Sequence, residues 1–360
     1  MSETMKAIVV GTGFGCRIQV PALRAAGFEV AALVGANAER TSERARVNGV
    51  PAGYTDLAQA IAETGAQVVA ISSPPHAHAE LAITALNAGC HVLCEKPFAA
   101  DMDEAQAMLA AAEKAGKVHM MGHEFRFEPL RATVANALAE GIVGDPKLAT
   151  IVIMLPQLTT QQDEMPDWWF DIGEGGGWLG ALGSHVVDQL RTWLGEFESV
   201  SASLSSVAAT RGAADDSFAL RFRMTSGLEG VIQSSAGAWG PMLDVARVSG
   251  TEGTIWTEGG KVRFAGRSGD RDLPIAPELT LPPVPPLSDD PRYETARWKG
   301  LVQVELPAYI VLCQTLKAAI EGRTPASAVA PATFADGVAA MKVMDAIRAS
   351  ARDGGAMVKV

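Results

Sequence analysis

The 360-residue chain contains only 4 cysteines and no long uninterrupted apolar segment. So few cysteines fit a reducing cytoplasm better than a disulfide framework. No stretch approaches the roughly 20 apolar residues that a membrane helix requires. The first residues also lack the basic and apolar regions of a secretion signal. We therefore expect a cytoplasmic protein that does not enter a membrane.

Positive charge is scarce as well. Lys and Arg number 30 against 41 Asp and Glu, which gives a formal net charge of −11. A nucleic-acid partner is not expected, because phosphate binding requires clustered basic residues. A metal site is not expected either. Cys90 and Cys94 flank an apolar strand-like segment, so their sulfurs would lie roughly 13 Å apart, too far for one zinc ion.

Tryptophan is absent from the first 167 residues, although the chain has 7 in all. A single uniform domain would not segregate them in this way, so we expect two domains with different roles. Hydrophobic residues make up 48% of the chain and charged residues 20%, which excludes general disorder.

The first third of the sequence alternates between strand and helix patterns. Continuous apolar runs indicate buried parallel strands, and the segments between them have helical patterns. The strands are expected at residues 7–10, 30–34, 68–71 and 91–93, and the helices at 21–26, 38–47, 79–88 and 103–115. This alternation predicts an α/β Rossmann domain, a doubly wound parallel sheet, over residues 1–123.

The pattern changes after residue 123. Helices are expected at residues 129–139, 178–194, 309–321 and 333–351. Strands with short connections are expected at 148–154, 200–208, 217–224, 228–234, 245–249, 254–257 and 262–265. Such a succession predicts a large, open, mostly antiparallel sheet in an α+β domain over residues 124–360. Seven prolines in residues 274–291 indicate a stiff surface arm or a subunit-contact loop rather than a ligand for a peptide-binding domain.

A glycine motif follows the first strand directly and precedes a helix. Dinucleotide-binding folds use one glycine for a tight turn, one for close approach to the pyrophosphate, and a small third residue for helix packing. Gly11 and Gly13 fit the first two positions, Cys16 takes the third, and Gly15 is an additional glycine. We therefore expect a nicotinamide dinucleotide, with Phe14 also in the binding loop.

The second strand bears on the choice between NAD and NADP. An NAD site usually has an acid at the end of this strand to bind the ribose hydroxyls. Here Gly35 follows Val34, and Arg40 lies in the first turn of the next helix. Arg40 either contacts a 2′-phosphate or is an ordinary solvated residue. The pattern favours NADP over NAD.

Lys96 follows the last predicted parallel strand, where open α/β sheets bind ligands. Close to an oxidised nicotinamide ring, its ammonium group would be destabilised and would be able to exchange a substrate proton. The alternative, equally weighted from Cys94-Glu95-Lys96-Pro97 alone, is a surface lysine paired with Glu95.

In order and spacing, the motifs of the chain resemble those of the Gfo/Idh/MocA oxidoreductase family. They are the glycine loop, Ser73-Pro74-Pro75-His76-Ala77-His78, Glu95-Lys96-Pro97, Arg126-Phe127-Glu128-Pro129 and Gly183-Ser184-His185. The resemblance implies a Rossmann domain followed by an α+β domain that often forms homodimers or homotetramers through its sheet. It also implies hydride transfer between nicotinamide and a secondary alcohol or carbonyl of a sugar, cyclitol or related small molecule.

The resemblance also implies roles for individual residues. Lys96 and His185 would be catalytic and handle the hydroxyl proton. Cofactor contacts would come from Gly11, Gly13, Phe14, Gly15, Arg40, Ser73, Pro74, His78, Glu95 and Lys96. For His78, a helix-capping role is weighted equally. Of the substrate contacts, the resemblance implies His185. Two further groups are expected from their own positions: Arg126, which follows the last predicted strand of the Rossmann domain, and Trp168, Trp169 and Trp178, which lie beside a glycine run and either cover the substrate or plug the domain interface.

One position departs from the family pattern. Members commonly have an Asp four residues before the histidine, and this chain has Ala181. Three explanations remain open: a substrate with fewer hydroxyl groups, a carboxylate from Asp188 or Asp171, or a different reaction. The alternatives to net redox turnover are transient oxidation with a retained cofactor, as in a lyase or glycosidase, and a non-catalytic dinucleotide-binding regulator.

Overall fold

The computed structural model describes residues 4–208 and 212–360, which form two compact units. The first unit comprises the chain up to Phe127 together with Leu281–Val338. The second comprises Glu128–Thr280 and Ala339–Val360. Each unit has its own sheet and its own hydrophobic core.

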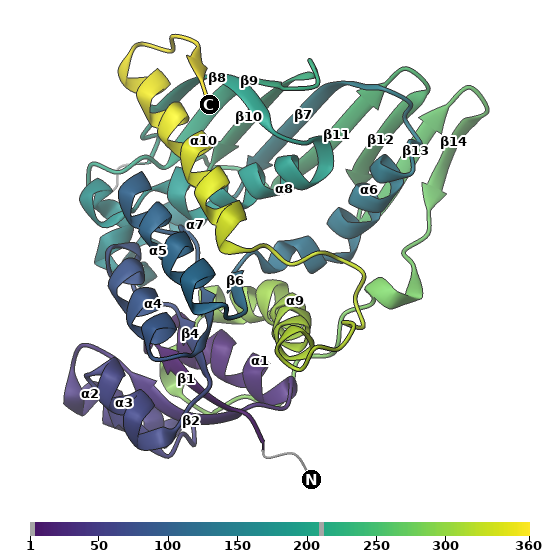
Figure 1. The fold of residues 1–360 in the computed structure, drawn as a ribbon. Coiled ribbons are helices and arrows are strands. Elements are labelled where there is room, and N and C mark those ends of the chain that lie inside the picture. The colour runs from purple at the N-terminus through teal and green to yellow at the C-terminus, as the bar shows by residue number, and fades with distance from the viewer. Residues whose placement is uncertain (1–3, 209–211) are drawn as a thin grey trace. The chain divides into compact units, whose positions relative to one another are not determined.

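A six-stranded parallel sheet forms the centre of the first unit (Figure 1). Its strand order is β3-β2-β1-β4-β5-β6, the order of a doubly wound dinucleotide-binding fold. The strands are β1 (Lys6–Val10), β2 (Glu29–Val34), β3 (Ala52–Tyr54), β4 (Val68–Ile71), β5 (His91–Cys94) and β6 (His119–Met121). The expected fold class is therefore confirmed for this unit.

Polar side chains start four helices of the first unit. Asn37, Asp56, Asp101 and Thr295 each accept a hydrogen bond from a backbone N–H in the first turn of the helix that follows. The helices are α1 (Val20–Ala25), α2 (Ala38–Val47), α3 (Leu57–Thr64), α4 (His78–Asn87), α5 (Met102–Ala115) and α9 (Ala296–Ile320). A short π-helical segment, η1 (Gly15–Gln19), leads into α1.

The assignment of all residues from 124 to 360 to one domain differs from the structure. Leu306, Tyr309 and Leu316 of α9 are buried in the same hydrophobic core as β1 and α1. The proline-rich segment also joins this unit, since Leu281, Val284 and Leu287 pack against that core. Residues 281–338 therefore belong with the nucleotide-binding fold, because their apolar side chains are buried there.

The second unit is built on a nine-stranded sheet with the order β14-β13-β12-β11-β7-β10-β9-β8-β15. Its neighbouring strands pair antiparallel, except that β7 and β10 run parallel. This confirms the predicted mostly antiparallel sheet. The strands are β7 (Pro146–Met154), β8 (Phe197–Ser205), β9 (Ser217–Met224), β10 (Glu229–Ser235), β11 (Leu243–Gly250), β12 (Gly253–Glu258), β13 (Lys261–Gly266), β14 (Gly269–Leu273) and β15 (Val358–Lys359).

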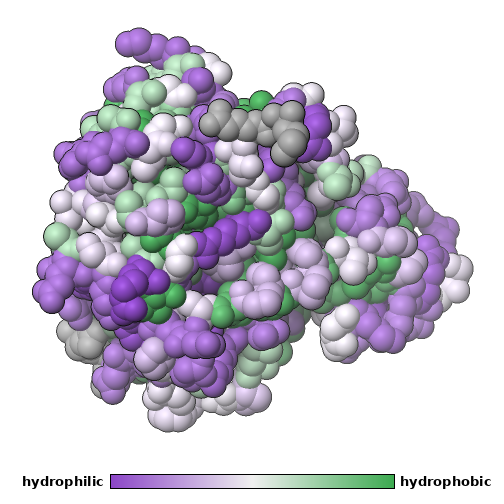
Figure 2. All heavy atoms as spheres, turned by 90° about the horizontal axis from the view of Figure 1, so that it is seen from below, coloured by the Kyte–Doolittle hydropathy of each residue, from purple (hydrophilic) through white to green (hydrophobic). Residues whose placement is uncertain are grey.

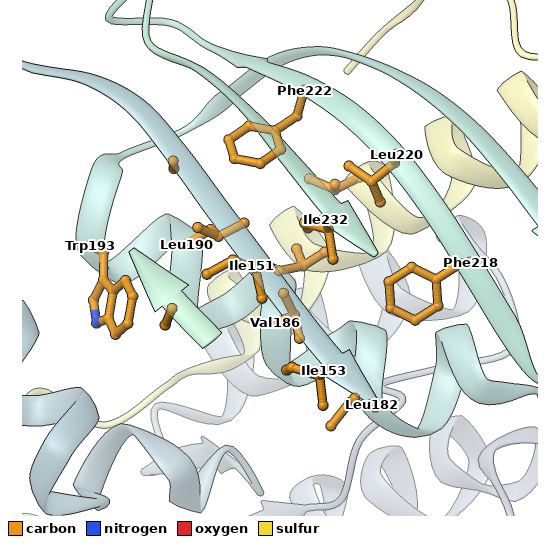
Figure 3. Packing of buried hydrophobic residues seen from close by; sticks show 14 of the residues in the cluster. Ile151, Ile153, Leu182, Val186, Leu190, Trp193, Phe218, Leu220, Phe222 and Ile232 are labelled. Carbon is orange, nitrogen blue, oxygen red and sulfur yellow. The ribbon is translucent and has the colours of Figure 1, made fainter. Parts of the chain in front are cut away.

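One face of this sheet carries the core of the second unit. Figure 3 shows Val186 and Leu190 of helix α8 (Ser184–Leu194) pointing toward Ile151 of β7 and the strands beside it. Along β7, buried and more exposed side chains alternate, as expected for a sheet with one covered face. The remaining helices are α6 (Pro129–Ala139), α7 (Gln157–Thr160) and α10 (Phe334–Arg352).

Hydrophilic side chains cover much of the face drawn in Figure 2, and hydrophobic atoms show in smaller areas between them. Within residues 4–208 and 212–360, no helix is both long enough and apolar enough to cross a bilayer.

Candidate active site

Three functional segments begin at the same level of the parallel sheet. Val10 pairs with Ile71, and Ile71 pairs with Cys94, so β1, β4 and β5 end in register. The glycine loop, Ser73 and Glu95-Lys96 follow these three strand ends. The strand order reverses between β1 and β4, and ligands of open α/β sheets bind outside the carboxyl ends at such a point.

The glycines of the loop have distinct structural reasons. Gly11 has a φ of +110°, and a Cβ there would lie 2.6 Å from the carbonyl oxygen of Ser72. At Gly15 a Cβ would lie 2.7 Å from both Val9 Cγ1 and Ser72 Oγ. Glycine at position 15 therefore allows the close packing of the helix on the strand. The sequence analysis assigned this role to Cys16, whose side chain is also buried.

The loop fits the pyrophosphate of a dinucleotide. A Cβ at Gly13 would meet no atom within 4 Å, so the backbone is open to a ligand at this position. Phe14 precedes η1 without a side-chain cap, and uncapped N–H groups at a helix start favour an anion. Gly11, Gly13, Phe14 and Gly15 are thus suited to hold the cofactor's phosphates.

Two side chains that the sequence analysis did not single out form hydrogen bonds to the glycine loop. Arg44 Nη1 donates hydrogen bonds to the Thr12 carbonyl oxygen at 2.6 Å and to Tyr293 Oη at 3.1 Å. Tyr293 Oη in turn donates to the Gly13 carbonyl oxygen at 3.2 Å. No local motif marks Tyr293, because 280 residues separate it from Gly13.

The end of β2 has no room for an acidic side chain. A Cβ at Gly35 would lie 2.6 Å from Thr41 Oγ1 and 2.8 Å from Thr12 Cγ2. Asn37 is engaged in capping α2 through the backbone N–H of Arg40. The Arg40 side chain is exposed in the first turn of α2, where it is available to a ligand.

His78 has a structural position. Its side chain is fully buried, with Nδ1 3.0 Å from the Pro97 carbonyl oxygen and Nε2 2.8 Å from the Ser73 carbonyl oxygen. Burial lowers the pKa of its imidazole. His78 thus links the loop after β4 to the loop after β5, and we no longer include its side chain among the cofactor contacts. Ser73 and Pro74 lie half-buried in the loop after β4.

Glu95 is held in place from two directions. Tyr309 Oη donates a hydrogen bond of 2.6 Å to Glu95 Oε1, and Gln19 Nε2 donates one of 2.9 Å to Tyr309 Oη. Burial raises the pKa of the Glu95 carboxyl, and the charge of Lys96 opposes that shift. The Lys96 side chain is half-buried beside it. A simple exposed surface pair is therefore wrong for this lysine, because its glutamate neighbour is buried.

Arg126 has protein partners within the first unit. Its guanidinium lies 3.2 Å from the Asp336 carboxylate, and Nη1 donates to the Ala330 carbonyl oxygen at 3.3 Å. The side chain is mostly buried. These contacts join η3 (Glu124–Phe127) to Ala330 and to the first turn of α10, and the expected substrate contact of Arg126 stays a prediction.

His185 lies in the second unit, near the start of α8, and is buried. The preceding turn, η7 (Leu179–Gly183), is π-helical and contains Ala181. Val186 and Leu190 point into the core, so His185 lies on a neighbouring face of the helix, one position around from Val186. Asp188 is also buried on α8.

The three predicted aromatic contacts differ in environment. Trp178 is 3% exposed, belongs to the core, and its Nε1 donates a 2.9 Å hydrogen bond to Ser234 Oγ. It is a core residue, and we remove it from the substrate contacts. Trp168 and Trp169 are half-buried, with ring centroids 6.0 Å apart. These two rings retain exposed surface for a ligand.

Two family models match the chain. Residues 5–123 match the description "Oxidoreductase family, NAD-binding Rossmann fold", and residues 132–256 match the "GFO/IDH/MocA C-terminal domain". The chain belongs to the Gfo/Idh/MocA family. The resemblance expected from the sequence motifs is therefore confirmed.

Several relatives within the family are oxidoreductases of sugars. An uncharacterized oxidoreductase from Synechocystis sp. is 33% identical over 58% of this chain and 57% of its own length. Levoglucosan dehydrogenase from Pseudarthrobacter phenanthrenivorans is 30% identical over 61% of this chain and 62% of its own length. The chain thus spans about three fifths of these two relatives. 1,5-anhydro-D-fructose reductase from Ensifer adhaerens is 29% identical over 72% of this chain and 79% of its own length.

Solved structures of other oxidoreductases share the fold over nearly the whole chain. Levoglucosan dehydrogenase in complex with NADH and levoglucosan has a TM-score of 0.82 and 26% identity, covering 99% of this chain and 100% of its own. An oxidoreductase from Agrobacterium radiobacter in complex with NAD+, L-tartaric acid and magnesium has a TM-score of 0.79, with 99% and 98% covered. Its identity of 20% shows the fold alone.

Proposed function

We propose that the protein is an NAD(P)-dependent oxidoreductase acting on a secondary alcohol or carbonyl of a sugar, cyclitol or related small molecule. The observation that carries this proposal is Lys96, half-buried at the end of β5 and level with the glycine loop at the end of β1. The sugar oxidoreductases among the relatives support the substrate class.

Each residue has one task in the proposed reaction. A bound nicotinamide supplies the hydride acceptor for alcohol oxidation or the hydride donor for carbonyl reduction. The glycine loop binds the dinucleotide phosphates through backbone N–H groups. Lys96 and His185 take up or return the proton of the reacting hydroxyl, and Trp168 and Trp169 offer aromatic surface to a sugar ring.

A substrate screen tests the proposal. Levoglucosan, 1,5-anhydro-D-fructose and a panel of sugars and cyclitols are incubated with each oxidised and reduced cofactor, and nicotinamide absorbance is followed. We expect stoichiometric turnover with at least one compound. Lys96→Met should abolish turnover while dinucleotide binding, measured by nicotinamide fluorescence, is retained. Undiminished turnover in that variant contradicts the role of Lys96. Cofactor that co-purifies without bulk turnover favours the retained-cofactor reaction.

We further propose that NADP is preferred to NAD. The support is the exposed Arg40 and the occupied space around Gly35, where an NAD site usually has an acid. Replacing Arg40 by Ala should weaken NADPH binding roughly tenfold, equivalent to about 1.4 kcal/mol, and leave NADH binding nearly unchanged. Arg46→Ala, an exposed arginine later in α2, is the matched control. Equal effects of Arg40→Ala on both cofactors would contradict the preference.

We also propose that the second unit forms homodimers or homotetramers through the uncovered face of its sheet. Leu148 is 61% exposed on β7, and Val231 is 48% exposed on the adjacent strand β10. Light scattering coupled to gel filtration should give a dimer or tetramer mass, and Leu148→Arg combined with Val231→Arg should reduce it to the monomer.

We also propose a cytoplasmic location for the protein. Its four cysteines are free and buried, which supports a reducing compartment.

A further inference from the structure

Three glutamates gather around Lys96 from separate parts of the first unit. Glu95 directly follows β5, Glu124 lies in η3, and Glu305 lies in α9, which packs on η3. The charge of Lys96 acts on all three carboxyl groups. All three carboxyl side chains are buried, and Glu305 is 8% exposed. The proposed chemistry uses Lys96 and leaves Glu124 and Glu305 without a task.

The fold makes specific room for this cluster. A Cβ at Gly122 would lie 2.5 Å from Glu95 Oε1, so only glycine leaves space for that carboxylate. Tyr309, one helical turn after Glu305 on α9, holds Glu95 through its 2.6 Å hydrogen bond. Glu305 Oε2 is buried and makes no hydrogen bond within the described residues. A buried carboxylate oxygen without a partner is costly when charged.

Electrostatics set the proton content of the cluster. Burial, together with the charges of Glu305 and Glu95, holds the pKa of Glu124 well above its usual range. The pKa of Glu305 is raised to about 7, because burial and the charge of Glu95 together outweigh the opposing charges of Lys96 and Arg297. Because like charges cannot all remain ionised in one buried site, the cluster keeps at least one proton near neutral pH.

We propose that Glu305 is a positioning residue that exchanges a proton with Lys96 and so resets the lysine between turnovers. This inference rests on the proposed function of Lys96. In the oxidation direction the hydride carries the electron pair from the carbinol carbon to nicotinamide, and the hydroxyl proton passes to the Lys96 amine. The Lys96 N–H bond then breaks as an O–H bond forms on the Glu305 carboxylate. Reduction reverses both transfers.

The first experiment measures protonation directly and requires no activity. Infrared difference spectra of the cofactor-free protein are recorded between about pH 6 and about pH 8, a window that brackets the titration. The wild-type protein should lose a protonated-carboxyl band on going to the higher pH. Glu305→Gln should lack this change, and Glu294→Gln, an exposed glutamate just before α9, should retain it. If Glu305→Gln still loses the protonated-carboxyl band at the higher pH, as the wild-type protein does, the proposal is overturned.

The second experiment follows the pH dependence of turnover with a substrate obtained from the screen. In Glu305→Gln we expect kcat to fall roughly tenfold, the loss of about one acid–base contribution, with KM unchanged and the wild-type limb near neutral pH absent. Glu305→Asp should restore part of the rate, and Glu294→Gln should behave as wild type. A Glu305→Gln variant that keeps the wild-type pH profile, with the same loss of rate at every pH and a lowered melting temperature, would instead show a purely structural role.

The two proposals fail in different ways. If Lys96→Met remains active, the proposed function of Lys96 is wrong, and the infrared titration of Glu305 is unaffected by that result. If Lys96→Met is inactive and Glu305→Gln keeps the wild-type pH profile, the role of Lys96 stands and the role of Glu305 is wrong.

Discussion

Tyr309 donates a 2.6 Å hydrogen bond to Glu95, although 214 residues separate the two in sequence. The bond joins helix α9 to the connection after strand β5, immediately before Lys96. It also continues to Gln19 at the end of η1, whose Nε2 donates to the same hydroxyl at 2.9 Å. The residue immediately before the proposed catalytic Lys96 is thus held by a side chain from a distant part of the sequence.

Tyr309→Phe should destabilise the protein by about 2 kcal/mol, because a buried hydrogen bond to a charged group is lost and Glu95 keeps its burial. Tyr54→Phe is a matched control, since Tyr54 donates a 2.9 Å bond to Glu63 at an exposed site, and we expect it to cost under about 0.5 kcal/mol. Urea unfolding measures both. A Tyr309→Phe effect no larger than the control would show that the bond does not hold Glu95.

Gly13→Ala and Gly15→Ala should have opposite consequences. Alanine at position 13 meets open space, so we expect a melting temperature near that of wild type and weaker dinucleotide binding. Alanine at position 15 would press on Val9 and Ser72 and should destabilise the fold by about 1 to 3 kcal/mol. Thermal melts and nicotinamide fluorescence check the pair. Loss of folding in Gly13→Ala would contradict the assignment of that space to a ligand.

Gly35→Asp should fail to convert the protein to an NAD enzyme. The new Cβ would meet Thr41 Oγ1, which is held by a 2.6 Å hydrogen bond to the Asn37 carbonyl oxygen. We expect a destabilisation of about 1 to 3 kcal/mol from this overpacking. Adding Thr41→Ala should recover part of it by removing the blocking hydroxyl. A stable single variant with improved NADH binding would contradict this description of the β2 end.

Glu305→Gln should change stability in a pH-dependent manner. The folded-state pKa of Glu305 is about 7, above its ordinary value of 4.5, so the folded protein binds more protons than the unfolded chain between these values. Its carboxyl therefore lowers stability progressively as pH rises through that window, by up to about 3 kcal/mol. The variant should gain stability relative to wild type at about pH 8 and little at about pH 4. Parallel urea midpoints at both pH values would contradict the raised pKa.

Local sequence patterns predicted much of the fold. The strand expected at residues 217–224 coincides with β9, and the apolar runs of the first third are the buried strands of the parallel sheet. The structure has strands directly before the glycine loop and before Glu95-Lys96, and a helix at His185, as the sequence predicted. These succeed because burial on a sheet and the turn before a helix depend on neighbouring residues.

Helix α9 shows where local patterns were insufficient. The sequence predicted a helix only from residue 309, after Pro307, but α9 begins at Ala296 and continues through the proline. Leu306, Ala308 and Tyr309 are fully buried, and this packing outweighs the hydrogen bond that Pro307 removes. The missed half of the helix contains Glu305.

The sequence by itself determined the family and the two sheets, and it singled out Lys96 and His185 as candidate catalytic residues, since motifs and periodicity are local properties. Only the tertiary structure decided what surrounds them. It brought Tyr293 and Arg44 to the glycine loop, Tyr309 and Glu305 to the connection after β5, and placed His78 and Trp178 in buried structural positions. These relationships arise from burial and hydrogen bonding between segments up to 290 residues apart, which no local pattern encodes.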